Sequence, residues 1–256
     1  MKNRTFVLFG RLMKHILRSP DTIITVAITP IAIMLMFVYV FGGAIKASLP
    51  EDVNYVSYQL PGILLMAIGS GIGYTAFRMF TDKEKGLFSR FNSMPISRSS
   101  ALGAHMLVSL VSNMLTVVII FLVALIMGFR SSAGILEWLS AAGILLFFTL
   151  ALTCVAVIPG LTAKTLEGAY AFSYPLIFLP MFSSAFAPTE TMPAAVRSFA
   201  ENQPVTSIVE TVRALLNSEP VGNDIWIALA WCIGIMIVAW FFAMRAYNTN
   251  LLKKSQ

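Results

Sequence analysis

Charged residues are scarce in this sequence. Asp, Glu, Lys and Arg make up only 12% of its 256 residues, whereas a water-soluble domain carries about 25%. Hydrophobic residues account for 57%. A chain of this composition cannot keep most of its surface in water, which excludes an ordinary soluble domain and indicates a protein embedded in a lipid bilayer.

Motifs for catalysis and nucleotide binding are also absent. The sequence has no G-x-x-x-x-G-K-[ST] phosphate loop, no H-E-x-x-H and no C-x-x-C. Gly69-Ser-Gly-Ile-Gly73 resembles a dinucleotide fingerprint, but it lies inside an apolar run without a preceding strand, so close helix packing is the better interpretation. His15 and His105 are isolated in sequence, and we interpret them as structural. We expect no catalytic, metal or cofactor site, and an integral membrane enzyme is disfavoured.

Six long apolar runs contain no Asp, Glu, Lys or Arg. They cover residues 22–43, 55–77, 101–128, 138–158, 169–186 and 225–244. Most reach the ~20 residues that a helix needs to cross a bilayer. The fold class predicted is an all-α integral membrane protein with six transmembrane helices, forming a single transmembrane domain over residues 1–256. Polar residues inside the third run, such as Ser109 and Asn113, predict hydrogen bonds between helices.

Lys and Arg are divided unequally between alternate connections of these runs. The richer side holds Lys2, Arg4, Arg11, Lys14, Arg18, Arg78, Lys83, Lys85, Arg90, Arg98, Lys164, Arg245, Lys253 and Lys254, and the poorer side holds Lys46, Arg130, Arg197 and Arg213. Basic residues accumulate on the cytoplasmic side of membrane proteins. We therefore expect a multi-pass protein of the cell membrane with both termini in the cytoplasm, and its net charge of +6 indicates topology rather than nucleic-acid binding.

Two segments on the richer side are predicted to be helices outside the bilayer. Residues 1–21 place apolar and basic residues on opposite faces, as in a helix at the membrane interface. This helix either only anchors the chain or also contacts a cytoplasmic partner. Residues 82–94 predict a short helix with an apolar side, which packs under its own bundle or docks on a soluble partner. The spacing of the residues alone does not distinguish between these alternatives for either segment.

On the poorer side, residues 187–224 contain four prolines and one amphipathic helix. Its predicted apolar face consists of Val205, Ile208, Val209, Val212, Leu215 and Leu216. Asn202 is a candidate N-cap. Because about 13 residues cannot cross a bilayer, the segment is predicted to be re-entrant or interfacial. It is a structural cap in the favoured interpretation and an outer gate in the alternative one.

Aromatic residues recur at every fourth position of the fifth run. They are Tyr170, Tyr174, Phe178 and Phe182. Packing or lipid contact is the favoured explanation. The alternative is a path for an amphiphilic aromatic substrate, joined by Tyr74 and Phe77 of the second run.

Several pieces of the sequence resemble the type-2 ABC exporter permeases, the daunorubicin-resistance-like membrane subunits. The matching pieces are Leu60-Pro-Gly-Ile-Leu-Leu-Met66, Glu84-Lys-Gly-Leu-Phe-Ser-Arg90 running to Met94-Pro-Ile-Ser-Arg98, Phe186-Ala-Pro188, and Gln203-Pro-Val-Thr206 running to Arg213-Ala-Leu-Leu216. With the order of the spans, the likeness covers nearly the whole chain. The family often has Asn-Pro where this chain has Gln203-Pro204.

The resemblance implies that two copies of the chain, a homodimer in the simplest case, pair with two copies of a separate ATP-binding subunit. ATP would be bound by that subunit alone. Residues 82–94 would be the coupling helix, with the ATPase contact made by Glu84, Leu87, Phe88, Arg90 and Phe91. The second and fifth spans would face the dimer axis, which makes Tyr74, Phe77, Tyr174 and Phe178 candidate residues of the substrate path.

Three functions remain open at this stage. The leading hypothesis is the permease subunit of an ATP-driven exporter of a drug, an antibiotic or another amphiphile. Export of a lipid-linked glycan or a lipid is the first alternative, and an ATP-independent channel or facilitator is the second.

Overall fold

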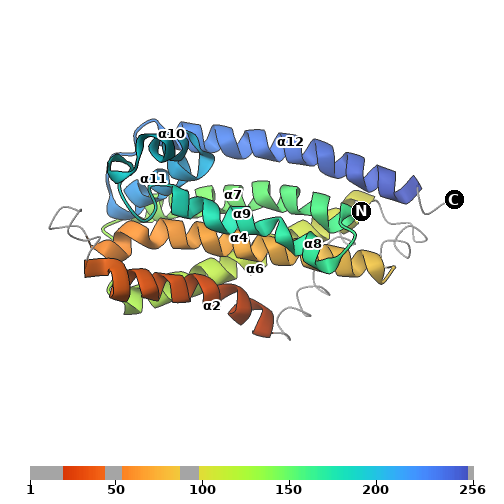
Figure 1. The fold of residues 1–256 in the computed structure, drawn as a ribbon, viewed down its shortest axis with the longest axis horizontal. Coiled ribbons are helices and arrows are strands. Elements are labelled where there is room, and N and C mark those ends of the chain that lie inside the picture. Colours follow the sequence, from red (N-terminus) through yellow and green to blue (C-terminus); the bar gives the residue numbers. More distant parts are fainter. Residues whose placement is uncertain (1–19, 44–53, 87–97, 253–256) are drawn as a thin grey trace.

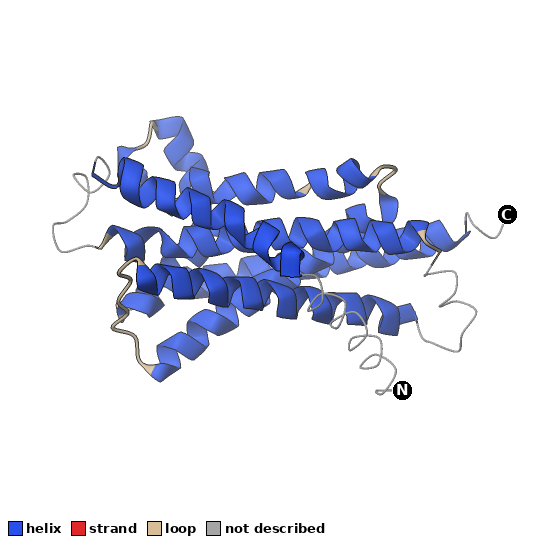
Figure 2. Cartoon of the chain, turned by 90° about the horizontal axis from the view of Figure 1, so that it is seen from below, coloured by secondary structure: helices blue, strands red, loops and turns tan. Residues whose placement is uncertain are grey.

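The computed structural model describes residues 20–43, 54–86 and 98–252, and within these ranges every regular element is a helix. Figure 2 shows helices and loops and no strand among the coloured residues. The long helices lie side by side in one elongated bundle (Figure 1). The prediction of an all-helical protein is therefore confirmed for this part of the chain. The interfacial helix predicted over residues 1–21 lies almost entirely outside the described residues and stays a prediction.

Four of the described helices are long and apolar enough to cross a membrane. They are α4 (Tyr55–Glu84), α6 (Arg98–Ile126), α7 (Ile135–Thr162) and α12 (Asp224–Leu252). They coincide with the second, third, fourth and sixth apolar runs. The first run forms α2 (Pro20–Met36), which continues into the π-helix η1 (Phe37–Phe41). The prediction of six spans is thus confirmed only in part.

The fifth apolar run is broken into short pieces. It forms α8 (Leu166–Ala171), α9 (Ser173–Phe178) and the 3-10 helix η2 (Leu179–Phe182). Pro175 and Pro180 lie within these pieces and supply no backbone N–H, so each removes one hydrogen bond from the ladder that a continuous helix would need. A run of apolar residues therefore did not produce one long helix here.

Short helices gather at one end of the bundle (Figure 1). They are η3 (Thr189–Thr191), α10 (Ala194–Asn202) and α11 (Pro204–Asn217). We name α10 and α11 the cap and this end the cap end. All six residues of the predicted apolar face of α11 are buried, which confirms that face. Asn202 does not cap α11, because it ends α10, and Gln203 is the N-cap.

Helix α4 is the centre of the bundle. Most of its side chains between Tyr55 and Phe80 are buried, and α2, α6, α7, α8, α9 and α11 all pack against it. Glycines bring the neighbouring backbones close: a Cβ at Gly69 would lie 3.1 Å from the carbonyl oxygen of Leu176, and one at Gly71 would lie 2.2 Å from Oδ1 of Asn113. The interpretation of these glycines as helix-packing residues is confirmed.

Helix α4 is longer than the sequence predicts. It continues through Asp82 to Glu84 and stops at a turn in which Gly86 has a φ of 68°, a left-handed conformation that glycine adopts without strain. The predicted start of the coupling helix at residue 82 is therefore wrong, since residues 82–84 form the last turn of α4. The remainder, residues 87–94, lies outside the described residues. We name the end of the bundle where α4 stops the connection end.

Close packing at Gly62 can be tested with a single methyl group. A Cβ there would lie 2.4 Å from Cβ of Ala185, which has no rotamer with which to move away. We expect Gly62→Ala to cost about 1–3 kcal/mol through overpacking and to lower the melting temperature in detergent. Gly234→Ala is the matched control, because nothing lies within 4 Å of the added methyl group in α12. Equal melting temperatures for the two variants would contradict the packing described here.

Candidate functional site

The four predicted path residues lie on two helices that pack against each other. The rings of Tyr74 and Phe77 on α4 are stacked with centroids 5.2 Å apart. On α9, Tyr174 and Phe178 are 52% and 51% exposed. The two helices approach each other closely at Gly73, because a Cβ added there would lie only 2.4 Å from Oγ of Ser173 on α9. The structure thus brings these aromatic residues to one helix pair, whose α9 side is open in the single chain.

A basic residue adjoins this aromatic face. The guanidinium carbon of Arg78 lies 5.3 Å from the ring centre of Tyr74. Its Nη1 atom is buried without a hydrogen-bond partner among the described residues. Arg78 is one turn closer to the connection end than Tyr74, so the aromatic face ends in a positive charge on that side.

Only one of the predicted ATPase-contact residues is described. Glu84 is the last residue of α4, and its side chain is exposed. Leu87, Phe88, Arg90 and Phe91 lie outside the described residues. Their contact with an ATP-binding subunit stays a prediction.

His105, which is isolated in sequence, contacts a side chain of α4 in the structure, in line with a structural role. Its Nε2 atom lies 3.4 Å from Oδ2 of Asp82, and the His105 side chain is only 8% exposed. The next residue of α4, Lys83, donates from Nζ to the carbonyl oxygen of Ala163 at 3.2 Å. The last turn of α4 is therefore bonded both to α6 and to the residue that follows α7. Asp82 and His105 are far apart in sequence, and no motif connects them.

Hydroxyl groups join α4, α6 and α7 in the bundle interior. Oγ1 of Thr75 lies 2.8 Å from Oγ of Ser109, which in turn lies 3.2 Å from Oγ1 of Thr153. Asn113 donates from Nδ2 to the carbonyl oxygen of Ser109 at 2.9 Å. The prediction of hydrogen bonding between helices is confirmed for Ser109. Such bonds contribute roughly 0.6 kcal/mol each in membrane proteins.

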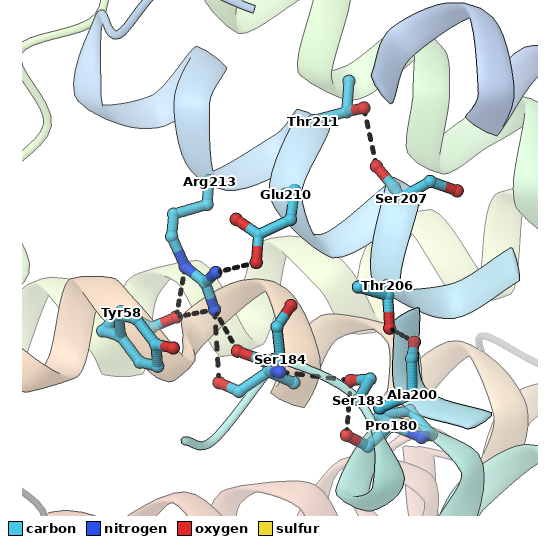
Figure 3. A network of polar contacts seen from close by, with 11 residues as sticks. Tyr58, Pro180, Ser183, Ser184, Ala200, Thr206, Ser207, Glu210, Thr211 and Arg213 are labelled. Carbon is cyan, nitrogen blue, oxygen red and sulfur yellow. Dashed lines mark hydrogen bonds and ion pairs between the residues drawn. The ribbon is translucent and has the colours of Figure 1, made fainter. Parts of the chain in front are cut away.

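The largest polar network centres on Arg213 of α11, which is 7% exposed (Figure 3). Its Nε and Nη2 atoms each donate to the carbonyl oxygen of Tyr58 at 3.1 Å. Nη2 also donates to the carbonyl oxygen of Ser184 at 2.7 Å, and Nη1 donates to Glu210 at 2.7 Å. The guanidinium carbon lies 3.9 Å from the ring centre of Tyr58. One side chain of the cap thus binds both α4 and the segment that follows η2.

The backbone is irregular in both segments that Arg213 binds. Pro61 lies inside α4 and has no N–H for the carbonyl of Ser57, so the ladder of α4 loses one bond next to Tyr58. Ser184 belongs to a stretch without regular structure. An unpaired carbonyl in a membrane costs several kcal/mol, and neighbouring side chains usually satisfy such groups. Arg213 donates to the carbonyl of Ser184 in this way, and it adds hydrogen bonds to the carbonyl of Tyr58.

Other side chains hold the cap in the same way. Gln203 donates from Nε2 to the carbonyl oxygen of Phe182, at the end of η2. Ser131 and Ser132, in the connection between α6 and α7, donate to the carbonyl oxygens of Leu216 and Asn217 at 2.6 and 2.7 Å. Both ends of α11 are therefore bonded to the rest of the bundle. Among the described side chains, no group of three or more His, Cys, Asp or Glu could hold a metal ion.

Comparison with known proteins yields one family and several relatives. The family model described as "ABC-2 type transporter" matches residues 3–217. A daunorubicin resistance ABC transporter permease protein of Streptomyces coeruleorubidus is 27% identical over 244 residues, which cover 94% of this chain and 84% of that protein. A protein of Mycobacterium tuberculosis named "Probable doxorubicin resistance ABC transporter permease protein" is 24% identical over 238 residues, covering 92% and 84%.

The role of Arg213 can be tested against a second arginine of the cap. We expect Arg213→Met to destabilise the protein by about 3 kcal/mol, because it removes the hydrogen bonds to the carbonyls of Tyr58 and Ser184 and the ion pair with Glu210. Arg197→Met is the control. Its ion pair with Glu201 is about half exposed, so the expected loss is at most ~1 kcal/mol. Thermal unfolding in detergent measures both, and equal losses would contradict the network.

Proposed function

The chain belongs to the ABC-2 type transporter family, and on this premise we propose that it is the membrane-spanning permease subunit of an ATP-driven exporter. Its cargo is a drug, an antibiotic or another amphiphile. The observation that carries this proposal is the family match over residues 3–217. Because the sequence has no phosphate loop, ATP is bound and hydrolysed by a separate subunit, two copies of which serve two copies of this chain.

In this proposal the chain crosses the cell membrane six times. Helices α4, α6, α7 and α12 are four of the spans, helix α2 with η1 is the first, and α8, α9 and η2 together form the fifth. Lys83, Lys85, Lys164 and Arg245 all lie near the connection end of their helices. By the positive-inside rule, the connection end is cytoplasmic, the cap is external, and both chain termini are cytoplasmic.

The substrate path runs between two copies of the chain along the aromatic face. Tyr174 and Phe178 are half exposed on α9, whereas α4 behind them is buried. The two rings therefore form an aromatic surface that a second copy of the chain can face. Aromatic rings bind flat amphiphilic molecules through their faces and edges. Tyr74 and Phe77 complete this lining from α4. Export of a lipid-linked glycan or another lipid would use the same architecture with a different cargo.

The cap is primarily structural in this proposal. Hydrogen bonds from Arg213, Gln203, Ser131 and Ser132 hold both ends of α11 to the bundle. This arrangement supports a rigid external closure, with any gate opening at the dimer axis rather than by movement of α11 alone. An ATP-independent channel would not need a coupling segment. Co-purification of the chain with an ATP-binding protein distinguishes the exporter from such a channel.

The partner is tested by purifying the tagged chain from its native membrane. We expect a stoichiometric ATP-binding protein to co-purify, and we expect Phe88→Asp to abolish its retention, because a carboxylate would enter an apolar docking face. Ser89→Asp adds the same charge on the opposite side of the predicted coupling helix and is the matched control. A chain that purifies alone and conducts solute would establish the channel alternative.

The path residues are tested by truncating the exposed rings. We expect Tyr174→Ala and Phe178→Ala each to reduce transport about fivefold while the melting temperature stays constant, because both rings are exposed in the single chain. Phe241→Ala removes an exposed ring from α12, which packs on α7 and α11, and is the control. Unchanged transport by both α9 variants would exclude this face as the path.

A further inference from the structure

The contact between Asp82 and His105 has a particular position in the chain. Asp82 lies in the last turn of α4, and His105 lies in the second turn of α6. The chain between them contains the connection that joins these two helices directly, residues 85–97. The pair therefore bridges the two ends of the connection that the proposed function assigns to the ATP-binding partner.

This contact is largely shielded from water. The side chains of His105 and Asp82 are 8% and 22% exposed, and Nε2 of His105 lies 3.4 Å from Oδ2 of Asp82. Solvent and salt therefore weaken this contact less than they weaken an exposed ion pair.

Other residues in the last turns of α4 contact different parts of the bundle. Arg78, one turn earlier, lies over the ring of Tyr74 on the same helix. Lys83 bonds to the carbonyl of Ala163, next to the end of α7. A Cβ at Gly160 of α7 would lie 2.8 Å from Cβ of Met79, so α7 packs tightly on the same turns. Lys83 and Met79 therefore hold α7, and Asp82 holds α6.

We propose that Asp82 and His105 are positioning residues that make the ends of α4 and α6 move as one body when the partner subunit moves the connection between them. Without the pair, the end of α4 can move apart from the start of α6, and a displacement of the connection changes only the distance between these two helix ends. With the pair, the displacement reaches α4, which contacts most of the bundle. This inference rests on the proposed function, because it needs a partner that acts on the connection.

The test measures motion in the assembled complex and needs no knowledge of the cargo. In a Cys154→Ala/Cys232→Ala background, a nitroxide label at Leu122→Cys, 55% exposed on α6, reports the distance between the two copies. Distances are recorded without nucleotide and after trapping with ATP and vanadate. We expect wild type to shift on trapping. Asp82→Leu and His105→Phe should bind the ATP-binding subunit and hydrolyse ATP but lose the shift.

Two further variants separate positioning from mere stability. Glu167→Leu removes an exposed carboxylate from α8 and should keep the full shift. The exchange Asp82→His/His105→Asp rebuilds the pair and should restore the shift. If the single variants fail to assemble, this exchange variant alone tests the positioning role of the pair. An assembled exchange variant without a shift, or a full shift in both single variants, overturns the inference. A wild-type complex that does not form contradicts the proposed function instead.

Discussion

Hydrogen bonds from side chains to backbone carbonyls are the interaction on which the cap end of this bundle depends. Irregular backbone is tolerated within a membrane protein only where other groups bond to it. Here α2 ends in a π-helix, α4 contains Pro61, and the fifth run breaks up after η2. Gln59 donates to the carbonyl of Met34 just before the π-helix, Tyr55 donates to that of Phe186, and Arg213 donates to those of Tyr58 and Ser184. Tyr55, Tyr58 and Gln59 lie in the first two turns of α4, so that short stretch joins the irregular pieces into one body.

The connection end is built differently. There Asp82 of α4 contacts His105 of α6, and Lys83 donates to the carbonyl oxygen of Ala163, the residue after α7. Met79 packs against Gly160 of α7 on the same turns. The described contacts at this end thus join α4 to its two neighbours through side chains of α4. Further along α4, glycines bring the backbone of α9 close to it.

The sequence predicted those features that depend on local pattern alone. Length and apolarity predicted α4, α6, α7 and α12, and spacing predicted the buried face of α11. It failed where contacts between distant segments decide the structure. Arg213 was counted as an outer-side charge and as part of a matching piece of the family, but its contacts were not predicted, because nothing near it in sequence reveals the carbonyl of Tyr58, 155 residues away. The Asp82–His105 contact was missed for the same reason, and the break in the fifth run was hidden by its continuous apolarity although Pro175 and Pro180 were visible.

We propose that this chain moves its cargo only when an ATP-binding subunit drives it. The most direct measurement is the uptake of a fluorescent anthracycline into inside-out proteoliposomes that contain the chain with or without its co-purified ATP-binding subunit. The account predicts uptake against a gradient only when both subunits and hydrolysable ATP are present. Movement of the anthracycline down its gradient through the chain alone, at a rate that ATP and the second subunit do not change, would contradict it.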